Sequence, residues 1–147
     1  MTTPATYDDA NLILRLYEMR REEKMREARA WFVKNFHCDN LEEYNKVAPV
    51  GSQENAYARQ VITYNEMIAS LITSGVLNET LFFQSGQELL LVWVRISKML
   101  PELRESHKNP GLWKNLETVA QRYIEHMNRM GPDAFTAFAA RVSSRPR

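Results

Sequence analysis

The stretch from residue 78 to 103, NETLFFQSGQELLLVWVRISKMLPEL, contains the most apolar run of the chain, residues 89–94. Its apolar residues recur in steps of four and three, as on one side of a helix: Phe82, Gly86, Leu89, Trp93, Ile96, Leu100 and Leu103. The opposite side is polar and is interrupted only by Leu91: Gln84, Glu88, Arg95, Lys98 and Glu102. This pattern predicts a core helix around which the rest of the chain packs. Pro101 either ends this helix or kinks it, and Leu103, which continues the stripe, favours a kink or a short extra turn. The apolar run of six residues is far shorter than the ~20 that a membrane span needs, so we expect no membrane span.

Two other stretches carry the same periodicity. Residues 53–74 follow a capping residue, Ser52, and end at Gly75, and their apolar stripe is Tyr57, Val61, Tyr64, Ile68 and Leu71. Residues 110–130 lie between Asn109-Pro110 and Gly131-Pro132, with the stripe Trp113, Leu116, Ala120, Tyr123, Met127 and Met130. The short link after Gly75 predicts that the helix before it and the core helix are antiparallel neighbours.

The sequence of the N-terminal third predicts either one long straight helix or a helix that bends. Thr6 and Asp9 form a plausible capping pair, and no helix breaker occurs from there to about Phe36. Because the middle of this stretch, RREEKMRE, is almost wholly charged, it is either solvated in a straight helix of ~43 Å or the point of a bend.

Short helices are expected at residues 41–48 and 133–142. The fold class is therefore all-α, an antiparallel bundle of three or four long helices plus short connecting and C-terminal helices.

The domain organisation follows from length and composition. A chain of 147 residues predicts a single domain at 8–142, preceded by a frayed N-terminus at 1–7 and followed by a mobile basic tail at 143–147. The formal net charge of +1 exerts no general attraction on nucleic acid, so no nucleic-acid partner is expected. Cys38 is the single cysteine, which excludes an intramolecular disulfide, and the polar, acidic N-terminus has no export signal. We expect a cytoplasmic protein.

Catalytic and metal-binding patterns are absent from the sequence. A carboxylate-bridged metal centre in a helical bundle requires Glu-x-x-His, and none of His37, His107 and His126 has a glutamate three positions before it. Cys38 next to His37 is better explained as a partly buried structural cysteine, because adjacent residues on a helix do not face each other. Phosphate-binding loops and nucleophile motifs are also lacking. We expect no catalytic residue, no cofactor and no metal, and therefore no enzyme.

One cluster of basic residues could bind a polyanion: Arg20, Arg21, Lys24, Arg26 and Arg29. Glutamates are interleaved with it at the spacings that pair on a helix surface, as in Glu22 and Arg26. A solvated face explains this cluster better than a nucleic-acid contact, which needs a face of one sign. If such faces met in a second copy of the chain, the same residues would form interface salt bridges.

Large aromatic residues are the remaining candidates for a site. Trp31, Phe32, Trp93 and Trp113 could line an interface or an apolar pocket, although aromatics at helical spacing belong more often to an ordinary core. Glu66 and Glu88 are the acidic residues nearest the apolar stripes, and burial of either would make it of interest.

A diffuse set of residues resembles a known family: Tyr64, Glu66, Gly75, Asn78-Glu79, Trp93, Pro101, Arg104, Trp113 and Leu116-Glu117. Over about residues 12–127 the chain resembles an uncharacterised bacterial family catalogued as a domain of unknown function. The resemblance implies an all-helical fold and supplies no catalytic residue.

Our functional hypothesis is a non-catalytic helical module that works through protein contacts, either with another protein or by self-association as a homodimer. The alternative hypothesis is a helical bundle that binds a small apolar ligand between its helices.

Overall fold

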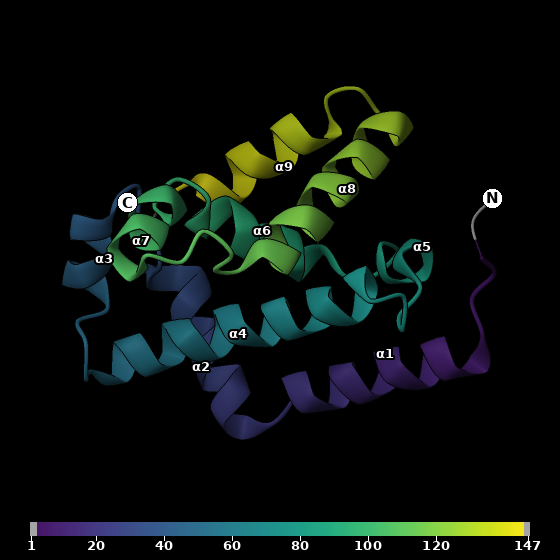
Figure 1. Cartoon of the computed structure of the whole chain (residues 1–147), viewed down its shortest axis with the longest axis horizontal. Coiled ribbons are helices and arrows are strands. Elements are labelled where there is room, and N and C mark those ends of the chain that lie inside the picture. Colours follow the sequence, from purple (N-terminus) through teal and green to yellow (C-terminus); the bar gives the residue numbers. More distant parts are fainter. Residues whose placement is uncertain (1–2, 146–147) are drawn as a thin grey trace.

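The computed structural model describes residues 3–145, and within them all regular secondary structure is helical (Figure 1). The nine helices of this part of the chain are α1 (Tyr7–Arg20), α2 (Glu23–Asn35), α3 (Leu41–Val47), α4 (Gln53–Thr73), α5 (Glu79–Phe82), α6 (Gln87–Ile96), α7 (Leu100–His107), α8 (Lys114–Met130) and α9 (Ala134–Ser143). The all-helical prediction is confirmed. No helix of the described residues is both long enough and apolar enough to cross a membrane.

The longest helix, α4, occupies the middle of the molecule (Figure 1). It packs against α2 on one side and against α8 and α6 on the other, while α9 lies against α6 and α8 and α3 contacts α7. Val61, Ile62 and Ile68 of α4 are buried in a core completed by residues such as Leu89 and Leu116. The helices on both flanks of α4 therefore share one hydrophobic core.

The boundaries of α4 agree with the sequence analysis. The Ser52 hydroxyl accepts a hydrogen bond from the Asn55 backbone N–H at 3.0 Å, as an N-cap residue does. Gly75 adopts a left-handed φ of +84° directly after the helix, a conformation that suits glycine. Local chemistry alone defines both ends of this helix.

The N-terminal segment is bent rather than straight. α1 ends at Arg20, and the Glu22 carboxylate accepts a hydrogen bond from the Met25 backbone N–H at 3.1 Å, which caps a new helix. The predicted capping pair is present, since the Asp9 backbone N–H donates to the Thr6 hydroxyl and the Thr6 backbone N–H donates to the Asp9 carboxylate. The N-terminal residues before α1, which were expected to be frayed, contact the rest of the protein. The Thr3 carbonyl accepts a hydrogen bond from the Asn78 side chain at 2.7 Å. Residues 1–2 and 146–147 lie outside the described part of the chain.

The predicted core helix over residues 78–103, which Pro101 was expected to end or kink, is not continuous. The segment forms three helices, with a first break between Phe82 and Gln87 and a second between Ile96 and Leu100. At the first break the Phe82 ring folds over Gly86, so closely that a Cβ atom on Gly86 would lie 2.3 Å from the ring. At the second break, Pro101 is the second residue of α7. A backbone N–H at this position has no partner within the helix, so proline, which lacks this group, costs no helical hydrogen bond there. The predicted apolar stripe is nevertheless almost wholly buried.

The start of α8 also differs from the prediction. Pro110 does not begin the helix, because Trp113 adopts a left-handed φ of 54° and α8 starts at Lys114. The N-terminus of α8 has no side-chain cap of its own. Instead Glu66, on α4, accepts hydrogen bonds from the Leu116 backbone N–H at 2.7 Å and from the Asn115 side chain at 3.4 Å. Burial raises the pKa of Glu66 above its ordinary value, against these hydrogen bonds, which lower it.

The sequence pattern places Arg95 on the polar side of its helix. The structure nevertheless buries this side chain, which is only 7% exposed. Its guanidinium donates to the carbonyls of Phe32, Val33 and Phe36 at the end of α2, at 2.7 to 3.2 Å. It also donates to the Val142 carbonyl of α9 at 2.6 Å. One side chain of α6 thus satisfies the free carbonyls at the ends of two other helices.

We predict that Gly86→Ala destabilises the protein by about 1–3 kcal/mol, because the new methyl group overlaps the buried Phe82 ring. Urea unfolding followed by circular dichroism measures the change. Gly111→Ala is the matched control, since the nearest atom to its new Cβ would be at an ordinary 3.5 Å. Equal stability of the two variants would contradict the packing of Phe82 over Gly86.

We predict that Glu66→Gln is at least as stable as the wild type at neutral pH, because glutamine still accepts from Leu116 and carries no charge to desolvate. The folded-state pKa of Glu66 lies above its unfolded value of 4.5, so the native state binds the proton more tightly. Wild-type stability relative to the variant therefore falls as pH rises from 4.5 through the folded-state pKa.

Unfolding free energies measured across this pH range test the Glu66 prediction. Glu125→Gln serves as the control, because Glu125 is exposed on α8 and its substitution should leave the pH profile unchanged. A Glu66→Gln profile that parallels that of the wild type at every pH would show that burial of this carboxyl group has no effect.

Candidate interaction surface

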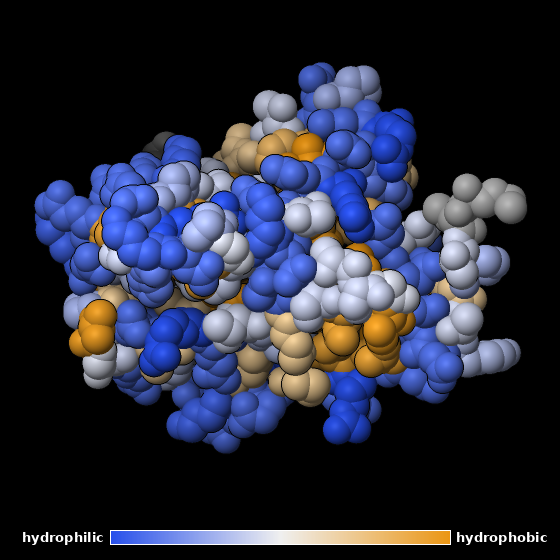
Figure 2. All heavy atoms as spheres, viewed as in Figure 1, coloured by the Kyte–Doolittle hydropathy of each residue, from blue (hydrophilic) through white to orange (hydrophobic). Residues whose placement is uncertain are grey.

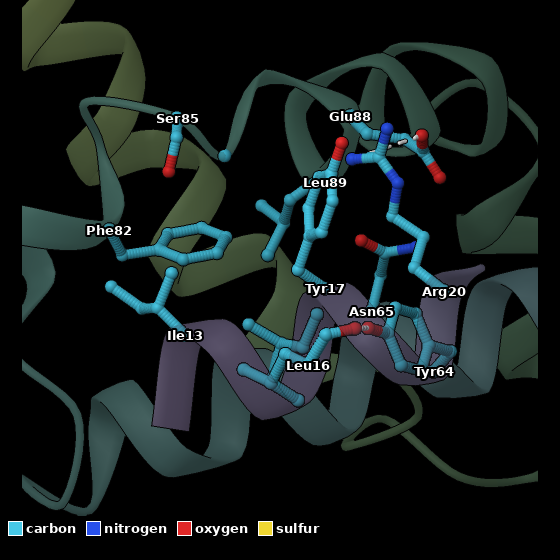
Figure 3. Close-up of a pocket in the computed structure, with 12 residues that line it drawn as sticks. Ile13, Leu16, Tyr17, Arg20, Tyr64, Asn65, Phe82, Ser85, Glu88 and Leu89 are labelled. Atoms are coloured by element: carbon cyan, nitrogen blue, oxygen red, sulfur yellow. Dashed lines mark hydrogen bonds and ion pairs between the residues drawn. The ribbon is translucent and has the colours of Figure 1, made fainter. Parts of the chain in front are cut away.

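A small hollow lies between α1, α4 and the turn that joins α5 to α6 (Figure 3). Its volume is about 60 Å³. Ile13 and Leu16 line it from α1, and apolar residues from α4 and α6, among them Ile68 and Leu89, complete the floor with Phe82. The rim is polar and is formed by Tyr17, Arg20 and Glu88. An apolar floor with a charged rim is the arrangement found at the centre of protein interfaces.

A buried tyrosine fixes α1 at this site. The Tyr64 hydroxyl of α4 donates a hydrogen bond to the Leu16 carbonyl of α1 (Figure 3). Burial raises the pKa of Tyr64, so the phenol remains protonated and keeps its role as donor. At the other end of α1, Asp9 accepts from the Asn78 backbone N–H at 2.8 Å, and this bond together with the Thr6 cap lowers the pKa of Asp9. The helix is held at both ends by polar contacts.

An ion pair closes the rim beside α2. The Glu88 carboxylate accepts two hydrogen bonds from Arg29, from Nε at 2.7 Å and from Nη2 at 2.6 Å, and Arg20 Nη1 lies 3.7 Å away. The bond to Glu88 raises the pKa of Arg29. Arg29 therefore forms a bidentate ion pair with Glu88 and Arg20 a looser one, and their partner lies on α6 and not among the glutamates interleaved with the basic cluster.

The outer side of α1 is apolar and uncovered. Tyr7, Leu14 and Tyr17 are 88%, 62% and 52% exposed, and they recur at the seven- and three-residue steps that place side chains on one stripe. The core side of the same helix is formed by Leu12, Ile13 and Leu16. Figure 2 shows apolar side chains gathering over α1 and the C-terminal half of α4. α1 thus presents one apolar side to the core and another to the outside, next to the hollow.

Possible nucleophiles and metal ligands are the next feature of this surface. Ser85 lines the hollow, but none of its hydrogen bonds joins it to a histidine or a carboxylate within the described residues, as an activated nucleophile requires. Cys38 is buried elsewhere, and burial raises the pKa of its thiol to about 11. Within residues 3–145 no three side chains of the His, Cys, Asp and Glu types gather in a way that could hold a metal ion.

The aromatic residues predicted as an interface or pocket lie apart from this hollow. Phe32 is fully buried and stacks on Phe36 at 4.6 Å between ring centroids, and Trp31 meets Phe36 edge-on at 6.3 Å. Trp93 and Trp113 are half-buried against the core from α6 and from the turn before α8. Their role as an interface stays a prediction.

Sequence reasoning missed the residues that form the hollow. The spacing of Leu16 and Tyr17 indicates only that the first helix has an apolar side, and nothing in it indicates a partner on α4 or α6. The available signal was the width of the apolar side of this helix, which is too broad for one neighbour: Tyr7, Ile13, Leu14, Leu16 and Tyr17.

Comparisons with known proteins identify a family and give no activity. No curated protein and no solved structure matches the chain. A family model described as "Domain of unknown function (DUF4760)" matches residues 5–123, which include the whole of the hollow and the outer side of α1. The chain therefore belongs to the DUF4760 domain family of unknown function.

Proposed function

We propose that the protein is a non-catalytic helical module that works through protein contacts, and that its partner is a second copy of the same chain bound through α1. The observation that carries this proposal is the exposed apolar stripe of Tyr7, Leu14 and Tyr17. Exposed side chains of this size on one helix face, next to an apolar hollow, mark an interaction surface in a protein of this size.

The stripe is complementary to itself in an antiparallel pair. Leu14 lies at its middle, with Tyr7 seven residues before it and Arg21 seven residues after it. If a two-fold axis passes through Leu14, the two leucines meet and each Arg21 faces the partner's Tyr7. Arg21 already lies over an aromatic ring, with its Cζ atom 5.8 Å from the centroid of Tyr17, so the same cation–π contact suits the partner's ring.

The charges at the ends of α1 support the antiparallel orientation. The first turn holds the acidic Asp8 and Asp9, and the last turn holds the basic Arg20. Antiparallel packing brings the acidic end of each helix to the basic end of its partner and aligns the two helix dipoles favourably. Parallel packing would place like ends together.

The size of the hollow favours a side chain as its occupant. Sites for small molecules commonly have volumes of ~300–1,000 Å³, whereas this hollow has about 60 Å³. An apolar side chain from the partner's α1 fits such a space, and the rim residues Tyr17, Arg20 and Glu88 would surround it with polar groups. This comparison supports protein contact over the alternative of a small apolar ligand.

We predict that the wild-type protein sediments as a dimer at tens of micromolar and that Leu14→Lys weakens the dimer at least about tenfold, because two buried charges would meet at the axis. Analytical ultracentrifugation over a concentration series measures both dissociation constants. Val50→Lys is the matched control, since Val50 is 90% exposed and lies between α3 and α4. A wild-type protein that is strictly monomeric, or equal effects of the two substitutions, would overturn self-association through α1.

We predict that Leu14→Cys forms a disulfide-linked dimer under mild oxidation, because side chains on a two-fold axis come within the reach of a disulfide. Cys38 is buried and does not compete, and Val50→Cys provides an exposed thiol away from the axis. Non-reducing gel electrophoresis should show the linked species for the first variant at dilutions at which the second remains monomeric. Equal linkage of both variants would indicate random collision instead of a defined interface.

A further inference from the structure

A second hollow, of about 120 Å³ and independent of α1, lies where the C-terminal ends of α2 and α9 meet the last turn of α6. Its lining is mostly polar and comes from three separate parts of the chain: His37, Asp39, Arg95, Lys98, Ser143 and Arg145. Three of these side chains are cations and one is an acid. This composition differs from that of the apolar hollow at α1.

Arg95 forms a buried wall of this hollow. A guanidinium has five N–H donors, and four of those of Arg95 bind the carbonyls of α2 and α9. One N–H on Nη2 remains, and within the described residues no carboxylate forms a salt bridge with this buried cation. The ends of two helix dipoles compensate its charge in part, at about −0.5 each.

The two other cations are held loosely. Lys98 Nζ lies 3.6 Å from Asp39 Oδ1, and Arg145 Nη2 lies 3.4 Å from Asp39 Oδ2 and 3.5 Å from Glu43 Oε2. These distances exceed the ~2.7–2.9 Å of a strong charge-assisted hydrogen bond. Asp39 is thus shared between two cations and satisfies neither completely, and Ser143 is another residue of the same lining.

The pKa of His37 reflects the charges that surround the hollow. Its pKa is lowered by burial first, and then by the positive charges of Arg95 and Arg145. The carbonyl of Lys34 and the carboxylate of Asp39 act in the opposite direction and do not reverse the shift. The groups that face His37 therefore act on it as a net positive charge.

We propose that this hollow binds a phosphate-type oxyanion, either inorganic phosphate or the phosphate group of a small phosphomonoester. Lys98 and Arg145 supply the charge, and Ser143 and the remaining N–H of Arg95 supply further donors. The volume of about 120 Å³ is well above the ~10–15 Å³ that one water needs, so the hollow has room for a group of five heavy atoms. The oxyanion takes the place of Asp39 as the acceptor between the two loosely held cations.

Nuclear magnetic resonance of the ¹⁵N-labelled full chain tests this proposal with inorganic phosphate as the probe at constant ionic strength. The expected result is a saturable shift of the backbone amides at residues 37–39 and 143–145, together with a rise in the pKa of His37, because a bound anion stabilises the imidazolium. Methyl phosphate is titrated in parallel, and tighter binding than that of phosphate would identify a phosphomonoester as the source. Shifts that grow linearly without saturation, or equal shifts with chloride, would overturn the proposal.

Matched variants locate the site. The double substitution of Lys98→Ala and Arg145→Ala should weaken phosphate binding at least about tenfold, since each removes one charge-assisted contact from an exposed side chain. Lys46→Ala is the control, because Lys46 is an equally exposed lysine in a surface ion pair with Glu42. Unchanged affinity in the double variant would show that phosphate binds elsewhere and would also overturn the proposal.

Discussion

The fold depends on the polar side of α6, which holds α2 at two points. Glu88 and Arg95 lie seven residues apart, a spacing that puts them on the same side of the helix. Glu88 binds the Arg29 side chain at the middle of α2, and Arg95 binds the carbonyls at its end. Burying a guanidinium is costly unless its donors are used, and here four backbone carbonyls use them. The face that looks most suited to solvent is therefore a packing face.

The breaks on either side of α6 make this arrangement possible. α6 spans only ten residues, and the turns before and after it allow it to take its own direction between α5 and α7. A continuous helix over residues 78–103 would have tied the direction of Glu88 and Arg95 to that of Phe82 and Leu103. Phe82 instead folds back over Gly86, where only the absence of a Cβ atom leaves room for the ring. Gly86 thus permits the first of the two breaks in the apolar stripe.

The sequence predicted what local chemistry controls and failed where distant segments decide. The limits of α4, the Thr6 cap of α1 and the helical class all follow from neighbouring residues, and each is confirmed. The burial of Arg95 depends on carbonyls that lie 47 to 63 residues away in the chain, which no local spacing records. Leu91 was the one local sign, because it interrupts the polar side of α6 between Glu88 and Arg95. An apolar residue there indicates a neighbour, although it does not identify α2.

The two proposed binding surfaces share α6 and are nevertheless expected to act separately. Glu88 borders the apolar hollow near the start of the helix, and Arg95 borders the basic hollow near its end. The two residues are seven positions apart, about 10 Å along the helix axis, and each is held by its own contacts to α2. Coupling between the two surfaces would require movement of α2, which Glu88 holds at Arg29 near its middle and Arg95 holds at its C-terminal carbonyls. Neither ligand has to break these contacts.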